Sequence, residues 1–343
     1  MNELLIEEFK QSASLISKLD AGSISAVADA ITKSIKNGGK AIFMGNGGSS
    51  ADAQHIAAEL SGRYLMDRPA MAGISLSNVV PITAIGNDYG YEFVFQRQIE
   101  SVCKKEDVVV GLSTSGNSKN IILAIDAAKK IGATTVTFTG KGGQLKEIAD
   151  IPVVIDSPET PRIQEGYFVA CHAICGMVER SMYGPKAVFI DRDDTIYDDI
   201  GYCSNPDDFN VFDFVPNAIS RLNKAGYMVI LITNQSGINR EYFDVETLNS
   251  IHGKMIKQIE EGGGKVDDIF YCPHRPDENC SCRKPEIGMG VEAVKKYGIN
   301  VRESYMVGDS DKDIEFGERL GCRTVRVSEE FTFEDAVNQI LDS

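Results

Sequence analysis

Short apolar runs alternate with longer amphipathic stretches along almost the whole 343-residue chain. This rhythm limits the fold strongly, because strand–helix–strand repeats build a parallel sheet that is covered by helices. Two amphipathic stripes, Leu5–Leu19 and Val27–Ile35, predict helices at the start. Further helices are expected at 51–61, 120–131 and 162–180. The strands expected in this half are Ala41–Met44, Ile74–Leu76, Val108–Leu112, Thr135–Thr139 and Val153–Ile155.

The same rhythm restarts after Gly184-Pro185, which we take as a domain boundary. Helices are expected at 217–225, 245–260, 289–297 and 313–320. The strands expected between them are Ala187–Ile190, Met228–Thr233, Ile269–Tyr271, Tyr305–Val307 and Thr324–Val327. The sequence therefore predicts an α/β protein with two doubly wound parallel-sheet domains, at residues 1–183 and 186–343.

The composition argues against several classes of binding partner. The chain has 35 Lys+Arg against 50 Asp+Glu, a net charge of −15, and no run of basic residues. This argues against a nucleic-acid or anionic-membrane partner. No apolar run has the roughly 18–20 residues of a membrane span, and the N-terminus is acidic where a secretory signal would be basic. We expect a cytoplasmic protein without a membrane partner.

Two loops in the first half are suited to binding phosphate. The loops 45–50 and 113–118 are rich in glycine or hydroxyl side chains, and each follows a predicted strand and opens a predicted helix. Free N–H groups at a helix start favour an anion, and glycine permits close backbone approach. A single such loop is more often a plain turn, but two in the same context favour a phosphate site.

Two pairs of polar side chains share helix faces in this half. His55 and Glu59 lie four residues apart, and Gln164 and His172 lie eight apart, which is about two turns. A surface ion pair is the ordinary interpretation of an isolated His/Glu pair. Histidine is scarce here, with four in the chain, and both histidines of this half have a second polar residue on the same face.

The segments GNGGSSADAQHIAAELSGRY, GNDYGYE, GLSTSGNS and RIQEGYFVACH resemble sedoheptulose 7-phosphate isomerases, a family of sugar-isomerase (SIS) domain enzymes. The resemblance covers about residues 1–183 and implies a flavodoxin-like fold, a phosphosugar substrate and a homotetramer formed through this domain. It implies a zinc site made by His55, Glu59, Gln164 and His172. It also implies substrate contacts from Asn46, Gly47, Gly48, Ser49, Asp88, Ser113, Thr114, Ser115, Ser118 and Gln164.

Aldose–ketose isomerisation moves a proton between adjacent carbons through an enediol. It needs a base at carbon and an acid at oxygen. Glu59 is the candidate base and His172 the candidate acid, with zinc polarising the oxygens.

In the second half, carboxylates follow predicted strands. Asp191 and Asp193 come directly after one strand and Asp309 after another, so together they are candidates to hold Mg²⁺. Thr233-Asn234 ends a third strand, and Lys284 adds a cation. A carboxylate at a strand end is more often a helix cap, but four such elements in this order favour a phosphoryl-transfer site.

Three cysteines and a histidine fall within eleven residues: Cys272, His274, Cys280 and Cys282. Three thiolates and one imidazole form a closed tetrahedral set that suits structural zinc. A buried-cysteine interpretation explains one thiol but not this cluster. The loop ends at Arg283-Lys284, so zinc would fix the segment that delivers Lys284 to phosphate and Arg283 to a second substrate anion.

The order DxDxT, Thr, Lys, GDxxxD resembles the haloacid dehalogenase (HAD) superfamily of phosphatases. The resemblance implies a Rossmann-like fold with a minimal cap, Asp191 as the nucleophile and Asp193 as the general acid and base. It places Mg²⁺ on Asp191, the Asp193 carbonyl and Asp309, with Asp313 orienting this set, and places Thr233, Asn234 and Lys284 on the phosphoryl group.

Within that superfamily, FIDRDDTIYDDIGY, TNQSGINR, CPHRPDENCSCRKPEIGM and MVGDSDKDIEFG resemble heptose 1,7-bisphosphate phosphatases over about residues 186–343. Asp194 is a departure, since that position usually carries Gly or Asn. The two halves together imply a bifunctional enzyme of activated-heptose synthesis, with the phosphate at carbon 7 removed to leave heptose 1-phosphate. Two alternatives stay open: histidinol phosphate as the phosphatase substrate, and a non-catalytic SIS module that binds a partner or senses a sugar phosphate.

Overall fold

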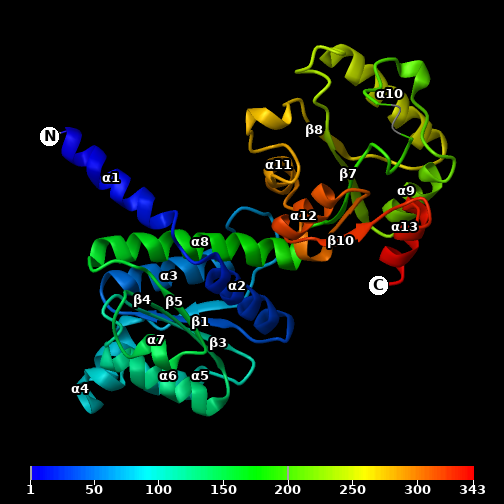
Figure 1. Ribbon diagram of the computed structural model, residues 1–343. Coiled ribbons are helices and arrows are strands. Elements are labelled where there is room, and N and C mark those ends of the chain that lie inside the picture. Colours follow the sequence, from blue (N-terminus) through cyan, green and yellow to red (C-terminus); the bar gives the residue numbers. More distant parts are fainter. Residues whose placement is uncertain (1, 199–200) are drawn as a thin grey trace. The chain divides into compact units, whose positions relative to one another are not determined.

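Two parallel five-stranded sheets, one in each half of the chain, organise the fold (Figure 1). The computed structural model describes residues 2–198 and 201–343. These fall into two units, Met1–Met182 and Tyr183–Ser343. The predicted α/β class with two parallel-sheet domains is confirmed.

The first sheet has the strand order β2-β1-β3-β4-β5. Its strands are β1 (Ala41–Gly45), β2 (Gly73–Ser75), β3 (Val108–Ser113), β4 (Thr134–Thr139) and β5 (Ile151–Val154). The helices of this unit are α1 (Asn2–Ile16), α2 (Ala21–Lys36), α3 (Gly48–Ser61), α4 (Val79–Tyr89), α5 (Gln96–Val102), α6 (Lys119–Ile131), α7 (Leu145–Ile148) and α8 (Thr160–Tyr183), with a 3-10 turn at η1 (Tyr91–Phe93).

Apolar side chains on both faces of this sheet form two separate cores. Helices α2, α3 and α8 pack on one face, where Phe43 and Val110 are buried, and α4 to α7 pack on the other, where Ile42 and Val109 are buried (Figure 1). Consecutive strand residues thus point to opposite faces and are buried on both, as in doubly wound parallel sheets.

The second sheet has the order β10-β9-β6-β7-β8. Its strands are β6 (Lys186–Ile190), β7 (Tyr227–Asn234), β8 (Asp268–Cys272), β9 (Tyr305–Gly308) and β10 (Arg323–Arg326). Helices α9, α10 and α13 cover one face, and α11 and α12 cover the other. The helices are α9 (Val215–Lys224), α10 (Val245–Glu261), α11 (Gly288–Tyr297), α12 (Asp311–Leu320) and α13 (Phe333–Leu341), with 3-10 turns at η2 (Pro206–Asp208), η3 (Pro276–Glu278) and η4 (Val301–Glu303).

Both strand orders place a topological switch point beside the first strand of the unit. In the first sheet β1 pairs with β3, with Gly45 opposite Leu112, and in the second β6 pairs with β9, with Ile190 opposite Val307. Ligands of open parallel sheets bind at the carboxyl ends of the strands at such points. The predicted phosphate loops follow β1 and β3, and the predicted magnesium carboxylates follow β6 and β9.

Helix α1 extends away from the rest of its unit and buries none of its residues (Figure 1). Among residues 2–198 and 201–343, no helix has both the length and the hydrophobicity that crossing a membrane would require.

Candidate functional sites

The loop after β3 gathers hydroxyl groups at the start of α6. The Ser113 hydroxyl lies 2.9 Å from that of Ser118 and 3.5 Å from that of Ser115. Ser118 precedes the first turn of α6, and its side chain caps none of that turn's N–H groups. The Thr114 carbonyl accepts a hydrogen bond from Gly140, which fixes the loop against β4. Hydroxyls and unbonded helix N–H groups at one point suit a phosphate.

The two loops are joined by a pair of amides. Asn46, after β1, and Asn120, in α6, exchange hydrogen bonds of 3.0 Å and 2.9 Å. The Tyr91 hydroxyl donates to the Asn46 carbonyl oxygen at 2.9 Å. Asn120 and Tyr91 were not identified from the sequence. The GNDYGYE motif contains Tyr91 and could have indicated its role, whereas no sequence motif indicates a role for Asn120.

Three of the four predicted zinc ligands meet at one point. The Nε2 atoms of His55, from α3, and His172, from α8, lie 3.1 Å apart, and His55 Nε2 lies 3.2 Å from Glu59 Oε1. The Phe168 ring packs against both imidazoles, at centroid distances of 4.8 Å and 4.5 Å. Ligands about 2.0–2.1 Å from a tetrahedral zinc lie roughly 3.3 Å from each other, so this donor set fits the ion.

The fourth predicted ligand, Gln164, lies one turn before Phe168 on α8. Its amide lies against Gly48, where any Cβ atom would collide with Nε2. Glycine at this position therefore leaves room for the amide beside the first loop. Gly47 has φ of 56° at the start of α3, a conformation that favours glycine, and Ser49 is buried. Asp88 is exposed near the end of α4, next to Asn87, and its role stays a prediction.

In the second unit, a lysine joins a carboxylate that follows β6 to a carboxylate in the first turn of α12. Lys284 Nζ lies 2.6 Å from Asp191 Oδ1 and 2.6 Å from Asp313 Oδ1. Asp191, Asp309 and Asp313 each bring a carboxylate oxygen within 4.8 Å of the others. The second oxygen of Asp313 accepts from the Ser310 N–H and hydroxyl, which caps α12. Asp313 is fully buried and held by these hydrogen bonds, and its role in orienting this set stays a prediction.

The electrostatics of this cluster favour a divalent cation. Burial raises the pKa of Asp191 to about 8; the Lys284 ammonium opposes this shift, and the carboxylates of Asp313 and Asp193 add to it. Burial and Asp313 also raise the pKa of Asp309. Three carboxylates beside one ammonium leave excess negative charge, so a bound Mg²⁺ would stabilise their ionised forms.

The carboxylate of Asp193 is held by two residues to which the sequence motifs assigned no role. Arg192 donates to its Oδ1 from Nε at 2.8 Å and Nη2 at 2.6 Å, and Gln235 donates to its Oδ2 at 2.8 Å. The Thr233 hydroxyl lies 3.4 Å from the same oxygen and accepts from Gln235. Arg192 lies inside the DRDDT motif and Gln235 follows Thr233-Asn234, so both positions were visible but carried no assigned role.

Asn234 holds the backbone of the lysine segment. Its amide oxygen accepts from the Lys284 N–H at 3.0 Å, and its Nδ2 donates to the Lys284 carbonyl at 3.2 Å. Both polar ends of Asn234 are therefore used to position Lys284 beside Asp191. Arg283 donates to the His274 carbonyl at 3.1 Å, so its predicted contact with a substrate anion stays a prediction.

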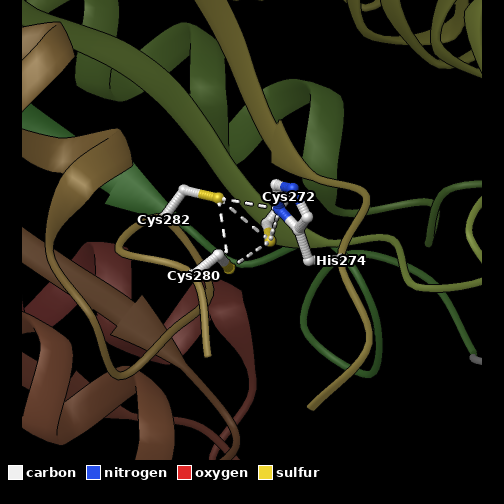
Figure 2. A group of neighbouring side chains, drawn as sticks. All are labelled: Cys272, His274, Cys280 and Cys282. Atoms are coloured by element: carbon white, nitrogen blue, oxygen red, sulfur yellow. Dashed lines mark hydrogen bonds between the residues drawn. The ribbon is translucent and has the colours of Figure 1, made fainter. Parts of the chain in front are cut away.

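The four predicted ligands of the cysteine cluster converge from β8 and the loop that follows (Figure 2). Cys282 Sγ lies 3.2 Å from Cys272 Sγ, 3.4 Å from Cys280 Sγ and 3.2 Å from His274 Nδ1. Although burial opposes it, hydrogen bonds from the Cys282 and Arg283 backbone lower the pKa of Cys280 to about 7. Three thiols and an imidazole lie close enough together to bind tetrahedral zinc, and the lowered pKa of Cys280 favours its thiolate form.

Comparisons with known proteins give separate results for the two halves. The SIS domain family matches residues 6–140, and the HAD-hydrolase-like family matches residues 281–341. A phosphoheptose isomerase of Akkermansia muciniphila is 48% identical over 182 residues, which is 52% of this chain and 94% of that protein. The solved phosphoheptose isomerase of Neisseria gonorrhoeae is 34% identical, with a TM-score of 0.48, covering 52% of this chain and 98% of that one.

A solved structure is also similar to the second half. D,D-heptose 1,7-bisphosphate phosphatase from B. bronchiseptica, complexed with magnesium and phosphate, is 34% identical, with a TM-score of 0.43. The match covers 46% of this chain and 98% of that one.

Proposed function

The chain belongs, through its N-terminal half, to the phosphoheptose isomerase family, and on that premise we propose that it is a bifunctional enzyme of heptose metabolism. Residues 1–183 interconvert sedoheptulose 7-phosphate and D-glycero-D-manno-heptose 7-phosphate. Residues 186–343 remove one phosphate of heptose 1,7-bisphosphate, with carbon 7 favoured. One observation carries the proposal. His55 Nε2 lies 3.1 Å from His172 Nε2 and 3.2 Å from Glu59 Oε1, in the same unit in which hydrogen bonds join the two predicted phosphate loops.

In the isomerase half, the chain's own residues anchor the substrate and move protons. The hydroxyls of Ser113, Ser115 and Ser118 hold the phosphate at the start of α6. Glu59 takes the proton from one carbon and returns it to the next. His172 acts as the acid that exchanges protons with the substrate oxygens. His55, Glu59, Gln164 and His172 would hold zinc, which when bound polarises the substrate oxygens. The intermediate is an enediol, so no group is lost or gained overall.

In the phosphatase half, Asp191 attacks phosphorus and forms an aspartyl phosphate while the sugar hydroxyl leaves with a proton from Asp193. Asp193 then takes a proton from water, which hydrolyses the aspartyl phosphate. Lys284 and Thr233 contact the transferring group, and Arg192 and Gln235 orient Asp193. Asp191, the Asp193 carbonyl and Asp309 would hold Mg²⁺, which when bound neutralises charge on the phosphoryl oxygens.

A basic hollow that is lined in part by Lys284 favours a bisphosphate over histidinol phosphate. The hollow has a volume of about 480 Å³, and among the described residues its lining contains Arg275, Arg283, Lys284 and Lys312 and one acidic side chain, Glu286. Such a surface attracts a second phosphate and repels the amine of histidinol phosphate. This is the support for the heptose substrate.

We further propose that the chain forms a homotetramer and that it is cytoplasmic. The exposed apolar side chains of α1 support a homotetramer built through the N-terminal domain, since Leu4, Leu5, Ile6 and Phe9 are 51–74% exposed on one helix. The eight cysteines are all free thiols, which suits a reducing, cytoplasmic location.

The experiment that tests the function follows both reactions in the purified chain. Ketose–aldose conversion is measured with sedoheptulose 7-phosphate, and phosphate release with both anomers of heptose 1,7-bisphosphate and with histidinol phosphate. We expect conversion and release from a heptose bisphosphate. Preferred hydrolysis of histidinol phosphate would reassign the second half, and a zinc-loaded protein without ketose–aldose conversion would favour the non-catalytic SIS alternative.

Cys280→Ser should remove the zinc of the cysteine cluster and lower the melting temperature of the second unit. A hydroxyl is a poor replacement for thiolate, and binding of structural zinc contributes directly to folding. Zinc content and calorimetric melting measure the effect. Cys322→Ser, which changes a thiol of the same unit that lies outside the cluster, is the control and should keep its zinc. Full zinc occupancy with unchanged melting in Cys280→Ser would exclude the cluster as a zinc site.

Asp194→Gly should keep or raise phosphatase activity. Asp194 has φ of 52°, a left-handed conformation that glycine adopts without strain, and its charge raises the pKa of Asp309 after burial and Asp313. Removing that carboxylate lowers the repulsion of the substrate phosphates. Turnover measured against Mg²⁺ concentration checks this. A lower maximal rate that requires much more Mg²⁺ would place Asp194 among the groups that support the metal.

A further inference from the structure

A buried ion pair lies behind the proposed isomerase site. Arg68, in the loop after α3, donates from Nε to Glu179 Oε1 on α8 at 3.0 Å, and both side chains are 1% exposed. A buried ion pair is tolerated only when further hydrogen bonds satisfy its remaining atoms. Neither residue belongs to the predicted sites, so their partners decide what the pair does.

On one side, the pair fixes the loop that follows α3. The Glu179 carboxylate accepts hydrogen bonds from three consecutive backbone N–H groups, those of Tyr64, Leu65 and Met66, at 2.9–3.0 Å. With Arg68 this makes four donors on one carboxylate. The backbone of this loop is therefore held in place on α8.

On the other side, the pair holds the end of the helix that carries Glu59. Arg68 donates from Nη2 to the Glu59 carbonyl at 2.8 Å and from Nη1 to the Leu60 and Gly62 carbonyls at 2.8 Å and 2.9 Å. Carbonyls at a helix end lack partners within the helix. One guanidinium thus donates hydrogen bonds to the carbonyls at the end of α3, and it connects the backbone of Glu59 to the Glu179 carboxylate.

The loop held in this way places an aromatic ring on His172. The ring of Tyr64 stacks on the imidazole, with centroids 5.4 Å apart and planes 19° apart. Gly176, one turn after His172, lies beside this ring, since a Cβ atom there would be 3.4 Å from Tyr64 Cε1. Glu179 lies seven residues after His172, about two helical turns, and therefore on the same face of α8.

We propose that Tyr64, held by Arg68 and Glu179, is a positioning residue that sets the ring orientation of His172 relative to Glu59. A stacked ring on one face and Phe168 at the edge resist rotation of the imidazole, so Nε2 stays directed toward His55 and Glu59. Small displacements of a reacting group can cost about 10²-fold in rate. The proposal rests on the isomerase function proposed above, and it assigns the role to the ring and not to the hydroxyl.

Two substitutions at Tyr64 test this in the zinc-loaded protein. Tyr64→Leu removes the ring, and we expect kcat for isomerisation to fall roughly 10–100-fold, with KM changed by less than about 3-fold, because substrate contacts remain. Zinc loss to a chelator should be faster by about 10-fold, as for other residues that orient metal ligands. Tyr64→Phe keeps the ring and should behave as the wild type in both measurements. Leu65→Ala, an exposed side chain of the same loop, is the matched control.

Equal loss of kcat in Tyr64→Phe and Tyr64→Leu would assign the effect to the hydroxyl and overturn the proposal, as would unchanged kcat and zinc loss in Tyr64→Leu. Glu179→Gln should reproduce the Tyr64→Leu phenotype if it folds, because it leaves Arg68 without its charge partner. If the wild type does not isomerise the substrate, the proposed function fails, while the chelator measurement still decides the positioning role.

Discussion

Asp191→Asn should abolish phosphate release and leave isomerisation unchanged. An amide cannot form the aspartyl phosphate, so the reaction loses its covalent step. Lys284 keeps its second partner, Asp313, at 2.6 Å, and the substitution removes one of three crowded carboxylates. We therefore expect a folded protein whose melting temperature is equal or higher. Release of inorganic phosphate and circular-dichroism melting measure the two effects.

The controls for this prediction use both halves of the chain. Asp213→Asn, an exposed carboxylate of the same unit, should release phosphate at the wild-type rate. Isomerase activity of Asp191→Asn serves as the internal control, because every residue of that site belongs to the other unit. Phosphate release by folded Asp191→Asn at the rate of Asp213→Asn would show that Asp191 is not the nucleophile.

Most strands of both sheets could be predicted from the sequence because they are short apolar runs, and β1, β3, β6 and β9 are buried along almost their whole length. All ten expected runs overlap an observed strand; three of them extend one residue past it, namely Ile74–Leu76 past β2, Val153–Ile155 past β5 and Thr324–Val327 past β10. The order of strands within each sheet could not be predicted from this rhythm. It depends on pairing between distant segments, as where β1 lies between β2 and β3.

The helices α4, α5, α7 and α13 were not predicted, for different reasons. Helix α4 buries none of its residues, and α5 and α7 have only seven and four residues, so none of the three has a strong apolar stripe. Helix α13 does have one, with Phe333, Ala336, Val337 and Ile340 buried, so its signal was present in the sequence.

Residues of the candidate sites could be predicted where they lie in motifs. The resemblance of the first half to phosphoheptose isomerases and of the second to the HAD superfamily is confirmed. The spacing of His55 and Glu59 already indicated a shared helix face. The residues that support the sites were missed because they act through contacts between distant segments, such as Arg68 with Glu179, and Asn120 with the predicted residue Asn46.

Glu59→Gln should remove isomerisation and leave phosphate release unchanged. Loss of a general base costs about 10²–10⁴-fold in rate, and the amide is a nearly isosteric replacement. Arg68 binds the backbone carbonyl of Glu59 and not its side chain, so the end of α3 keeps its hydrogen bond. The fold and the Tyr64 loop should therefore survive.

The measurement must separate a missing base from a missing metal ligand, because Glu59 Oε1 also lies 3.2 Å from His55 Nε2. Zinc content is measured together with exchange of the substrate's carbon-bound hydrogen in deuterated water. Glu147→Gln, an exposed carboxylate of the same unit, is the matched control and should exchange at the wild-type rate. If Glu59→Gln keeps its zinc but no longer exchanges the substrate hydrogen, Glu59 is the base. Exchange at the control rate in the folded, zinc-loaded variant would move the base to another residue of the site, and the enediol mechanism would then need a different proton acceptor.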